Sequence, residues 1–247
     1  MFTLLTRKSN QVDDSNPYWI SFSDIMAGLL VIFVLAALML ILQLTEQKET
    51  VDLKVTEIEQ ADRIRSEILG DVKEALEKQG IAVEISDNET VLRIPTNTLN
   101  FESDQATLRE DQQAVVEKIG IALLDAITTS DRGDYIDTIF IEGHTDSRPS
   151  AYKGVGNWLL SADRAVSIWR YWGLLDSTEA LWGLVNFRAE MMFSVSGYAE
   201  TRRVIEDDST PALRERNRRI DLRFTMKQPE KCEYQEARGI LACGPEQ

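Results

Sequence analysis

The sequence contains little histidine, little cysteine and no excess of positive charge. One histidine, His144, and two cysteines in 247 residues provide few ligands for a transition metal and few candidates for a thiol nucleophile. A net charge of −14 argues against a nucleic-acid-binding surface. The sequence also lacks a GxSxG motif and a glycine-rich phosphate loop. We therefore expect a protein that is not an enzyme, that binds no metal or other cofactor and that has no nucleic-acid partner.

Only one hydrophobic run is long enough to span a membrane, and it extends from Ile20 to Leu42. As a helix it would be roughly 34 Å long at about 1.5 Å per residue. The core of a secretory signal is usually shorter and ends at a small-residue cleavage site, whereas this run continues into the charged stretch Gln43 to Lys48. The pattern predicts an uncleaved transmembrane helix over residues 18–42, preceded by a short polar segment, residues 1–17.

Asp24 is the only ionisable side chain in this run. A carboxylate in the hydrocarbon region costs roughly 2.5 to 3.5 kcal/mol on insertion scales. On a helix, Asp24 shares a face with Ser21, Ala27, Gly28 and Val31. Because small residues allow helices to approach closely, we expect this face to contact protein. Two interpretations are open: the carboxylate reaches the headgroups near Tyr18 and Trp19, or it carries an ion through a helical assembly.

The residues from Tyr18 to Ala27, YWISFSDIMA, resemble the membrane-helix motif of MotB-type stator subunits. The resemblance implies that Asp24 takes and releases the driving ion. It also implies that copies of the chain lie inside a ring formed by a separate multi-span A subunit. A lone carboxylate with few oxygen neighbours favours a proton as the ion, while Ser21 and Ser23 leave sodium open.

Residues 43–79 are predicted to form a helical connector. The segment is rich in Glu and Lys, and Leu44, Val51, Val55 and Ile58 are spaced by three, four or seven positions. Such a stripe can pair with a second copy of the chain as a coiled coil, so we expect a homodimer. The alternative is a single amphipathic helix lying on its own domain, and the stripe is interrupted around residues 61–65.

Residues 80–227 alternate between strand-like and helix-like stretches, which predicts a mixed α/β domain with an α+β sandwich. Strands are expected near residues 81–85, 90–94, 136–142, 192–196 and 220–225, and helices near 108–126 and 157–172. The stretch between Trp172 and Met191 is predicted to add a further helix.

Four sequence blocks in this region resemble the OmpA-like peptidoglycan-binding domain. They are GHTD at residues 143–146, NWLLSADRA at 157–165, GYAE at 197–200 and NRRI at 217–220. One block alone would be a weak signal, but four blocks in the right order are a strong one. The resemblance implies an OmpA-like fold and peptidoglycan as a partner.

The chemistry of a binding site can be read from the same residues. Asp146 follows a predicted strand, and Asn157, Leu160 and Arg164 recur at spacings of three and four along a predicted helix, so their side chains can meet at one cleft. An amine-and-carboxylate ligand such as diaminopimelate would place its ammonium on Asp146 and its carboxylate on Arg164. The resemblance assigns this role to the matching pair. The alternative is a salt bridge between Asp146 and Arg164, worth about 0 to 1 kcal/mol if exposed.

Two cysteines, Cys232 and Cys243, lie close together in the C-terminal tail, residues 228–247. A short disulfide loop is sterically easy there, and two free thiols are the alternative. A disulfide indicates an oxidising compartment. Together with the domain resemblance, it favours a single-pass protein of the bacterial inner membrane whose N-terminus is cytoplasmic and whose C-terminal domain is periplasmic.

The short connector, the long stretch after Trp172 and the cysteine-bearing tail look more like the MotB-like subunits of Zorya anti-phage defence systems than like flagellar proteins. This implies a peptidoglycan-anchored, stator-like subunit of a proton-driven rotary motor in anti-phage defence. The alternatives are a flagellar stator subunit of the MotB type and a passive tether between the inner membrane and the cell wall.

Overall fold

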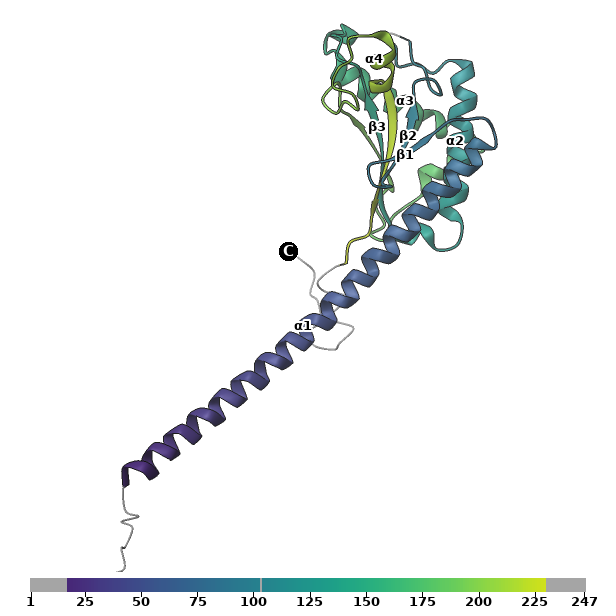
Figure 1. Ribbon diagram of the computed structural model, residues 1–247. Helices are drawn as coiled ribbons and strands as arrows, with labels where there is room; N and C mark the ends of the chain where they lie inside the picture. The colour runs from purple at the N-terminus through teal and green to yellow at the C-terminus, as the bar shows by residue number, and fades with distance from the viewer. Residues whose placement is uncertain (1–16, 103, 230–247) are drawn as a thin grey trace, which may run out of the picture. The chain divides into compact units, whose positions relative to one another are not determined.

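The computed structural model describes residues 17–102 and 104–229 (Figure 1). The chain divides into two units, Met1–Lys54 and Val55–Gln247. The division falls within helix α1, Pro17–Glu77. The predicted disulfide between Cys232 and Cys243 lies outside the described residues, as does most of the predicted N-terminal segment.

The first unit contains the apolar part of α1. An 18-residue stretch of this helix has a mean hydropathy of 3.1, and none of it is buried. Among the described residues, α1 is the one helix long and apolar enough to cross a membrane. Asp24 is exposed on it, together with the small residues of its predicted face. These properties fit a single-pass membrane protein.

The second unit is built on a five-stranded sheet, which confirms the predicted α/β class. The strand order is β1-β2-β5-β3-β4; β3 and β4 are parallel and the other neighbours are antiparallel. The strands are β1 (Glu84–Ser86), β2 (Val91–Pro95), β3 (Ile136–His144), β4 (Phe193–Gly197) and β5 (Arg219–Met226). The helices are α2 (Glu110–Thr128), α3 (Asn157–Trp172) and α4 (Pro211–Asn217), with 3₁₀ helices η1 (Arg132–Tyr135), η2 (Tyr152–Gly154) and η3 (Glu179–Gly183).

The last part of α1 belongs to the core of this domain. Its buried residues lie on one face of the helix and are Ala61, Ile64, Ile68, Leu69, Val72 and Leu76. The stripe is reinforced by polar contacts to η1, where Arg132 pairs with Asp71 at 2.6 Å and Gln60 donates to the Tyr135 hydroxyl at 2.7 Å. For this part of the predicted connector, the structure therefore shows the second of the two alternatives, an amphipathic helix packed on its own domain.

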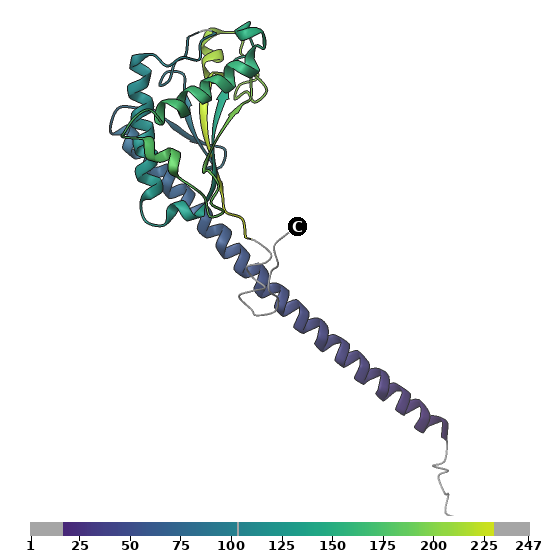
Figure 2. The ribbon, with the colours of Figure 1, turned by 180° about the vertical axis from the view of Figure 1, so that it is seen from behind.

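Two glycines bring α3 unusually close to the sheet. Gly143 of β3 and Gly197 of β4 are paired in register. A Cβ on Gly143 would collide with the backbone carbonyl of Ser161, and one on Gly197 would lie 2.5 Å from the Ala162 nitrogen. Ser161 is fully buried, and its hydroxyl accepts a hydrogen bond from the Ala199 N–H at 3.0 Å. Figure 2 shows α3 lying across the sheet at this face.

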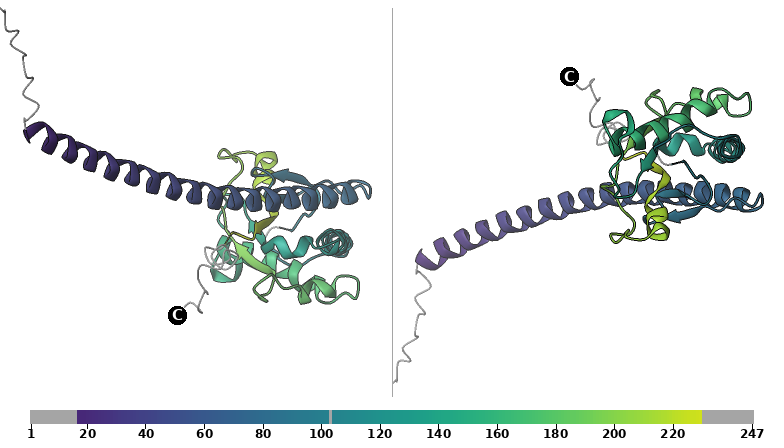
Figure 3. Two further views of the ribbon diagram at one scale, coloured as in Figure 1. Left: turned by 90° about the horizontal axis from the view of Figure 1, so that it is seen from below. Right: turned by 90° about the horizontal axis from the view of Figure 1, so that it is seen from above.

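The stretch between Trp172 and Met191 contains η3 instead of an additional α-helix. Trp172 is fully buried and its indole N–H donates to the Val116 carbonyl at 2.7 Å, which joins α3 to α2. Trp182 of η3 stacks on Trp169 of α3, with the ring centroids 5.0 Å apart. Trp182 thus covers part of the outer side of α3. Figure 3 shows the ribbon from below and from above.

The close approach of α3 leads to a stability prediction. Replacing Gly143 by alanine should lower the free energy of unfolding by at least about 2 kcal/mol, because backbone atoms must move to admit the methyl group. Gly70 of α1 has no atom within 4 Å of the position of an added Cβ. Gly70→Ala should therefore stabilise the domain by about 0.5–1 kcal/mol. Urea unfolding of both variants measures the difference, and equal effects at the two positions would contradict it.

Candidate functional site

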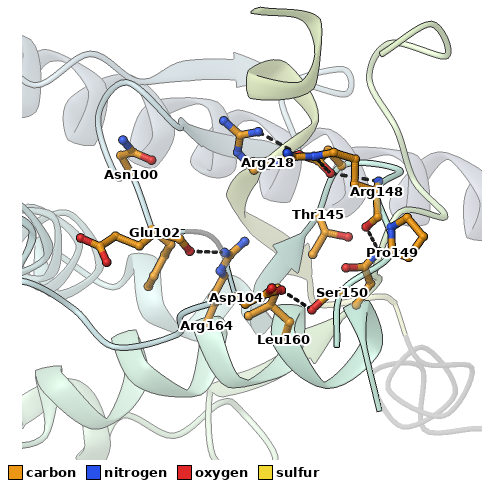
Figure 4. A pocket seen from close by; sticks show the side chains of 13 residues that line it. Asn100, Glu102, Asp104, Thr145, Arg148, Pro149, Ser150, Leu160, Arg164 and Arg218 are labelled. Carbon is orange, nitrogen blue, oxygen red and sulfur yellow. Dashed lines mark hydrogen bonds and ion pairs between the residues drawn. The ribbon is translucent and has the colours of Figure 1, made fainter. Parts of the chain in front are cut away.

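A cavity of about 400 Å³ opens where the end of β3, the start of α3 and the segment before α2 meet (Figure 4). Its lining residues are Asn100, Phe101, Glu102, Asp104, Thr145, Asp146, Arg148, Pro149, Ser150, Asn157, Leu160, Arg164 and Arg218. Most of these side chains are polar or charged. All four residues predicted for the binding site are among them, so the structure brings Asp146, Asn157, Leu160 and Arg164 together.

Asp146 lies just after β3 and is only 5% exposed. The loop that carries it is held by Ser147, whose N–H and hydroxyl both donate to Asp208, at 2.9 and 2.6 Å. The Asp146 carboxylate accepts hydrogen bonds from the Arg148 and Arg218 guanidiniums. Burial alone would raise the pKa of Asp146, but these hydrogen bonds outweigh it and hold the pKa below its ordinary value.

Arg164 of α3 is 4% exposed and lies beneath the cavity. Its guanidinium donates to two backbone carbonyls, those of Gln105 at 3.0 Å and Glu102 at 3.1 Å, and stacks near the Phe101 ring. Within residues 17–102 and 104–229 no carboxylate forms an ion pair with it. Burial, followed by the nearby Arg218, lowers the pKa of Arg164 to about 10. The cavity therefore contains a buried cation without an anionic partner among the described residues.

The predicted alternative of a salt bridge between Asp146 and Arg164 is not what the structure shows. Asp146 pairs with Arg218 at 2.8 Å and with Arg148 at 3.2 Å. Arg218 is placed by Thr96, whose hydroxyl donates to the Arg218 carbonyl. The loop and α3 are instead joined by Asn157, whose amide donates to the Arg148 carbonyl at 2.9 Å and to Glu200 at 3.0 Å.

Sequence reasoning missed two of the arginines that line the cavity. Arg218 lies within the NRRI block, so that motif pointed to the residue but not to its contact with Asp146. Arg148 follows Asp146 by two positions and lies outside every block. Its role depends on the turn that returns its side chain to Asp146. Asp104, whose carboxylate accepts a hydrogen bond from Ser150, also lies outside every block, and its place in the cavity depends on a contact across 46 positions.

A second polar cluster lies on the sheet at Glu142, His144 and Asp221, all buried, with potential ligand atoms within 4.8 Å of one another. Both carboxylates are already paired with guanidiniums, Asp221 with Arg219 and Glu142 with Arg223. Burial, together with these arginines, lowers the pKa of His144 to about 2, so the imidazole is neutral. A divalent cation would meet several positive charges there, and the cluster fits a structural ion network better than a metal site.

Comparison with known proteins identifies relatives of both parts of the chain. Residues 100–218 match the model of the OmpA family. The Zorya protein ZorB of Escherichia coli O139:H28 (strain E24377A / ETEC) is 25% identical over 230 residues, which is 90% of this chain and 85% of ZorB. The protein YtxE of Bacillus subtilis (strain 168) is 28% identical over 137 residues, 55% of this chain and 48% of YtxE.

A solved structure described as MotB-like, from Desulfovibrio vulgaris, superposes with a TM-score of 0.52 at 18% sequence identity. The match covers 70% of this chain and 98% of that protein. The likeness confirms the OmpA-like fold expected from the four sequence blocks.

The lowered pKa of Asp146 predicts how pH changes stability. A group whose pKa is lower in the folded state stabilises that state when ionised, and this contribution is lost as the pH falls through the folded-state pKa, below about 4. The loss of unfolding free energy caused by Asp146→Asn should therefore be larger at pH 7 than at pH 3. Urea unfolding at both pH values measures it. Asp111→Asn, which removes an exposed partner of Arg109, is the control and should show a smaller pH dependence. A pH-independent effect at Asp146 would contradict the assignment.

Proposed function

We propose that this chain, a MotB/OmpA-like protein similar to ZorB, is a peptidoglycan-anchored, stator-like subunit of a proton-driven rotary motor in anti-phage defence. The observation that carries the proposal is the cavity with a buried arginine that has no carboxylate partner among the described residues, in a chain whose apolar helical stretch contains one acid. In this reading the chain binds and anchors and does not make or break bonds in a substrate.

The wall anchor is proposed from the charges of the cavity. A buried guanidinium that lacks an anionic partner is stabilised when a ligand carboxylate binds it by paired hydrogen bonds. Arg164 has this property within the part of the chain that the structure describes, and Asp146 supplies the opposite charge within the same cavity. The diaminopimelate of a peptidoglycan stem carries an ammonium and a carboxylate on one carbon, so it matches both groups. Asn157 and Leu160 would contact the same ligand from the first turns of α3.

The motor role is proposed from Asp24. Its carboxylate is the only ionisable group in an otherwise apolar helical stretch, and it is exposed on the isolated chain. In a membrane, such a group is expected to face other protein helices rather than lipid. Helices of a separate ring-forming A subunit, ZorA-like or MotA-like, would supply that environment. Protonation and release at Asp24 would then change the fit between the inner helices and the ring.

The homodimer is proposed from the exposed stripe that precedes the domain. Ile41, Leu44, Val51, Val55 and Ile58 are all exposed on α1. Their spacings of three, four and seven form a seam like that of the core positions of a parallel coiled coil, in which Lys48 occupies one core position. A polar residue at one such position specifies the register of the pair. Two copies would place two Asp24 side chains inside one ring.

The anchor is tested by co-sedimentation of the full-length protein with purified peptidoglycan sacculi. Arg164→Gln and Asp146→Asn should each weaken binding by about tenfold or more, since a charge-assisted hydrogen bond contributes about 1.5–3 kcal/mol. Arg188→Gln is the control for the loss of a positive charge, because Arg188 pairs with Asp137 and Glu190 and does not line the cavity. Binding of the Arg164 and Asp146 variants at the level of the control would contradict the anchor.

The motor is tested by phage plating on cells that carry this gene with its neighbours. Asp24→Asn should abolish protection while leaving expression and sacculus binding unchanged, because the amide cannot take and release a proton. Asp24→Glu should retain part of the protection. Wild-type protection by Asp24→Asn would favour the passive tether. Loss of motility rather than of protection on deletion would favour a flagellar stator.

A further inference from the structure

The carboxylate that would hold the ligand's ammonium is already fully occupied. A carboxylate offers about four acceptor positions on its oxygens. One Asp146 oxygen accepts from the Arg148 backbone N–H at 3.0 Å and from Arg148 Nε at 3.3 Å. The other accepts from a terminal nitrogen of Arg148 at 3.2 Å and from Arg218 at 2.8 Å. An incoming ammonium therefore has to displace one of these donors.

The two arginines differ in how easily they can leave. The Arg218 side chain is 22% exposed, its contact with Asp146 is the shortest of the set, and its backbone is fixed by Thr96. The Arg148 side chain is 55% exposed. Its guanidinium bonds to Asp146 are long, at 3.3 and 3.2 Å, and because more than half of the side chain is exposed, water can solvate the released group. Figure 4 shows the Arg148 and Arg218 side chains close together at one side of the cavity.

We infer that Arg148 is a built-in competitor that occupies the ammonium position of the cavity until a ligand displaces it. The inference rests on the proposed binding of an amine-and-carboxylate ligand at this cavity. When Arg148 leaves, Asp146 keeps the Arg148 backbone N–H and Arg218 as donors, so its charge remains compensated while one position opens. Arg164 has no competitor of this kind among the described residues and is open to a carboxylate from the start.

This arrangement has a consequence for selectivity. A ligand that carries only carboxylates can bind Arg164 without moving Arg148. A ligand that also carries an ammonium gains a contact with Asp146, but its apparent affinity is reduced by the fraction of time that Arg148 occupies the acid. Removal of the Arg148 guanidinium should therefore favour ammonium-bearing ligands alone.

The experiment compares two probes, meso-diaminopimelate and pimelate, by calorimetric titration of the full-length protein in detergent. Pimelate has the same carbon chain and both terminal carboxylates but no amine. Arg148→Gln should bind meso-diaminopimelate about threefold to tenfold more tightly than the wild type, as expected when a competing state populated at about 70 to 90% is removed. Its affinity for pimelate should not change. Arg148→Lys, which keeps a cation but cannot form the paired contact, should lie between the wild type and Arg148→Gln.

Arg188→Gln serves as the matched control, since it removes a similarly exposed arginine with two carboxylate contacts outside the cavity. It should leave both affinities unchanged. Weaker binding of both probes by Arg148→Gln would overturn the inference and make Arg148 a direct ligand for a carboxylate. Unchanged binding of both probes would overturn it as well. A wild type that binds neither probe nor sacculi would instead overturn the proposed anchor, on which the inference depends.

Discussion

The contact of α3 with the ends of β3 and β4 determines where the charges of the cavity lie. It is possible only because Gly143 and Gly197 have no side chains, and the buried Ser161 fills the gap between them. With α3 at this distance, Arg164, one helical turn after Ser161, is carried below the loop that bears Asp146. Any side chain at either glycine would lift the helix from the sheet and separate the two charges. The positions of the two charges in the site therefore depend on how closely the backbone of α3 packs on the sheet.

The cavity stabilises its charges in two different ways. Asp146 is held by arginines, and the direct ion pairs keep its pKa low despite burial. Arg164 is held by backbone carbonyls, which orient the guanidinium but bring no negative charge, and burial lowers its pKa. A buried charge that is already paired gains little free energy from a ligand. A buried charge without a partner gains more when a ligand of opposite charge binds it. For the proposed ligand, this asymmetry means that its carboxylate contributes most to binding at Arg164, while its ammonium competes with Arg148 for Asp146.

The sequence was sufficient for the parts of the fold that depend on local pattern and on motifs. The expected helix at residues 157–172 coincides with α3, and the expected strands at 136–142 and 220–225 lie within β3 and β5. The motif blocks also placed Asp146, Asn157, Leu160 and Arg164 at one cavity. Contacts between distant segments could not be predicted from the sequence. Arg218, for example, contacts Asp146 across 72 positions, and its place depends on how β5 is paired.

For the connector too, the sequence did not reveal a contact between distant segments. That contact determines how α1 is attached to the domain. The connector's interrupted apolar stripe was compatible with a coiled coil and with a helix packed on its own domain. The choice between them depends on which surface is available to cover residues 61–76. In the structure that surface is the domain's own core, where Ile68, Leu69, Val72 and Leu76 are fully buried. Each such side chain contributes about 1.5–3 kcal/mol when it is removed from water. A pull along the last turns of α1 therefore acts on the hydrophobic core and not on a flexible loop. In the proposed function, the wall anchor must stay fixed while the membrane helix resists torque, and an attachment through the core meets that requirement.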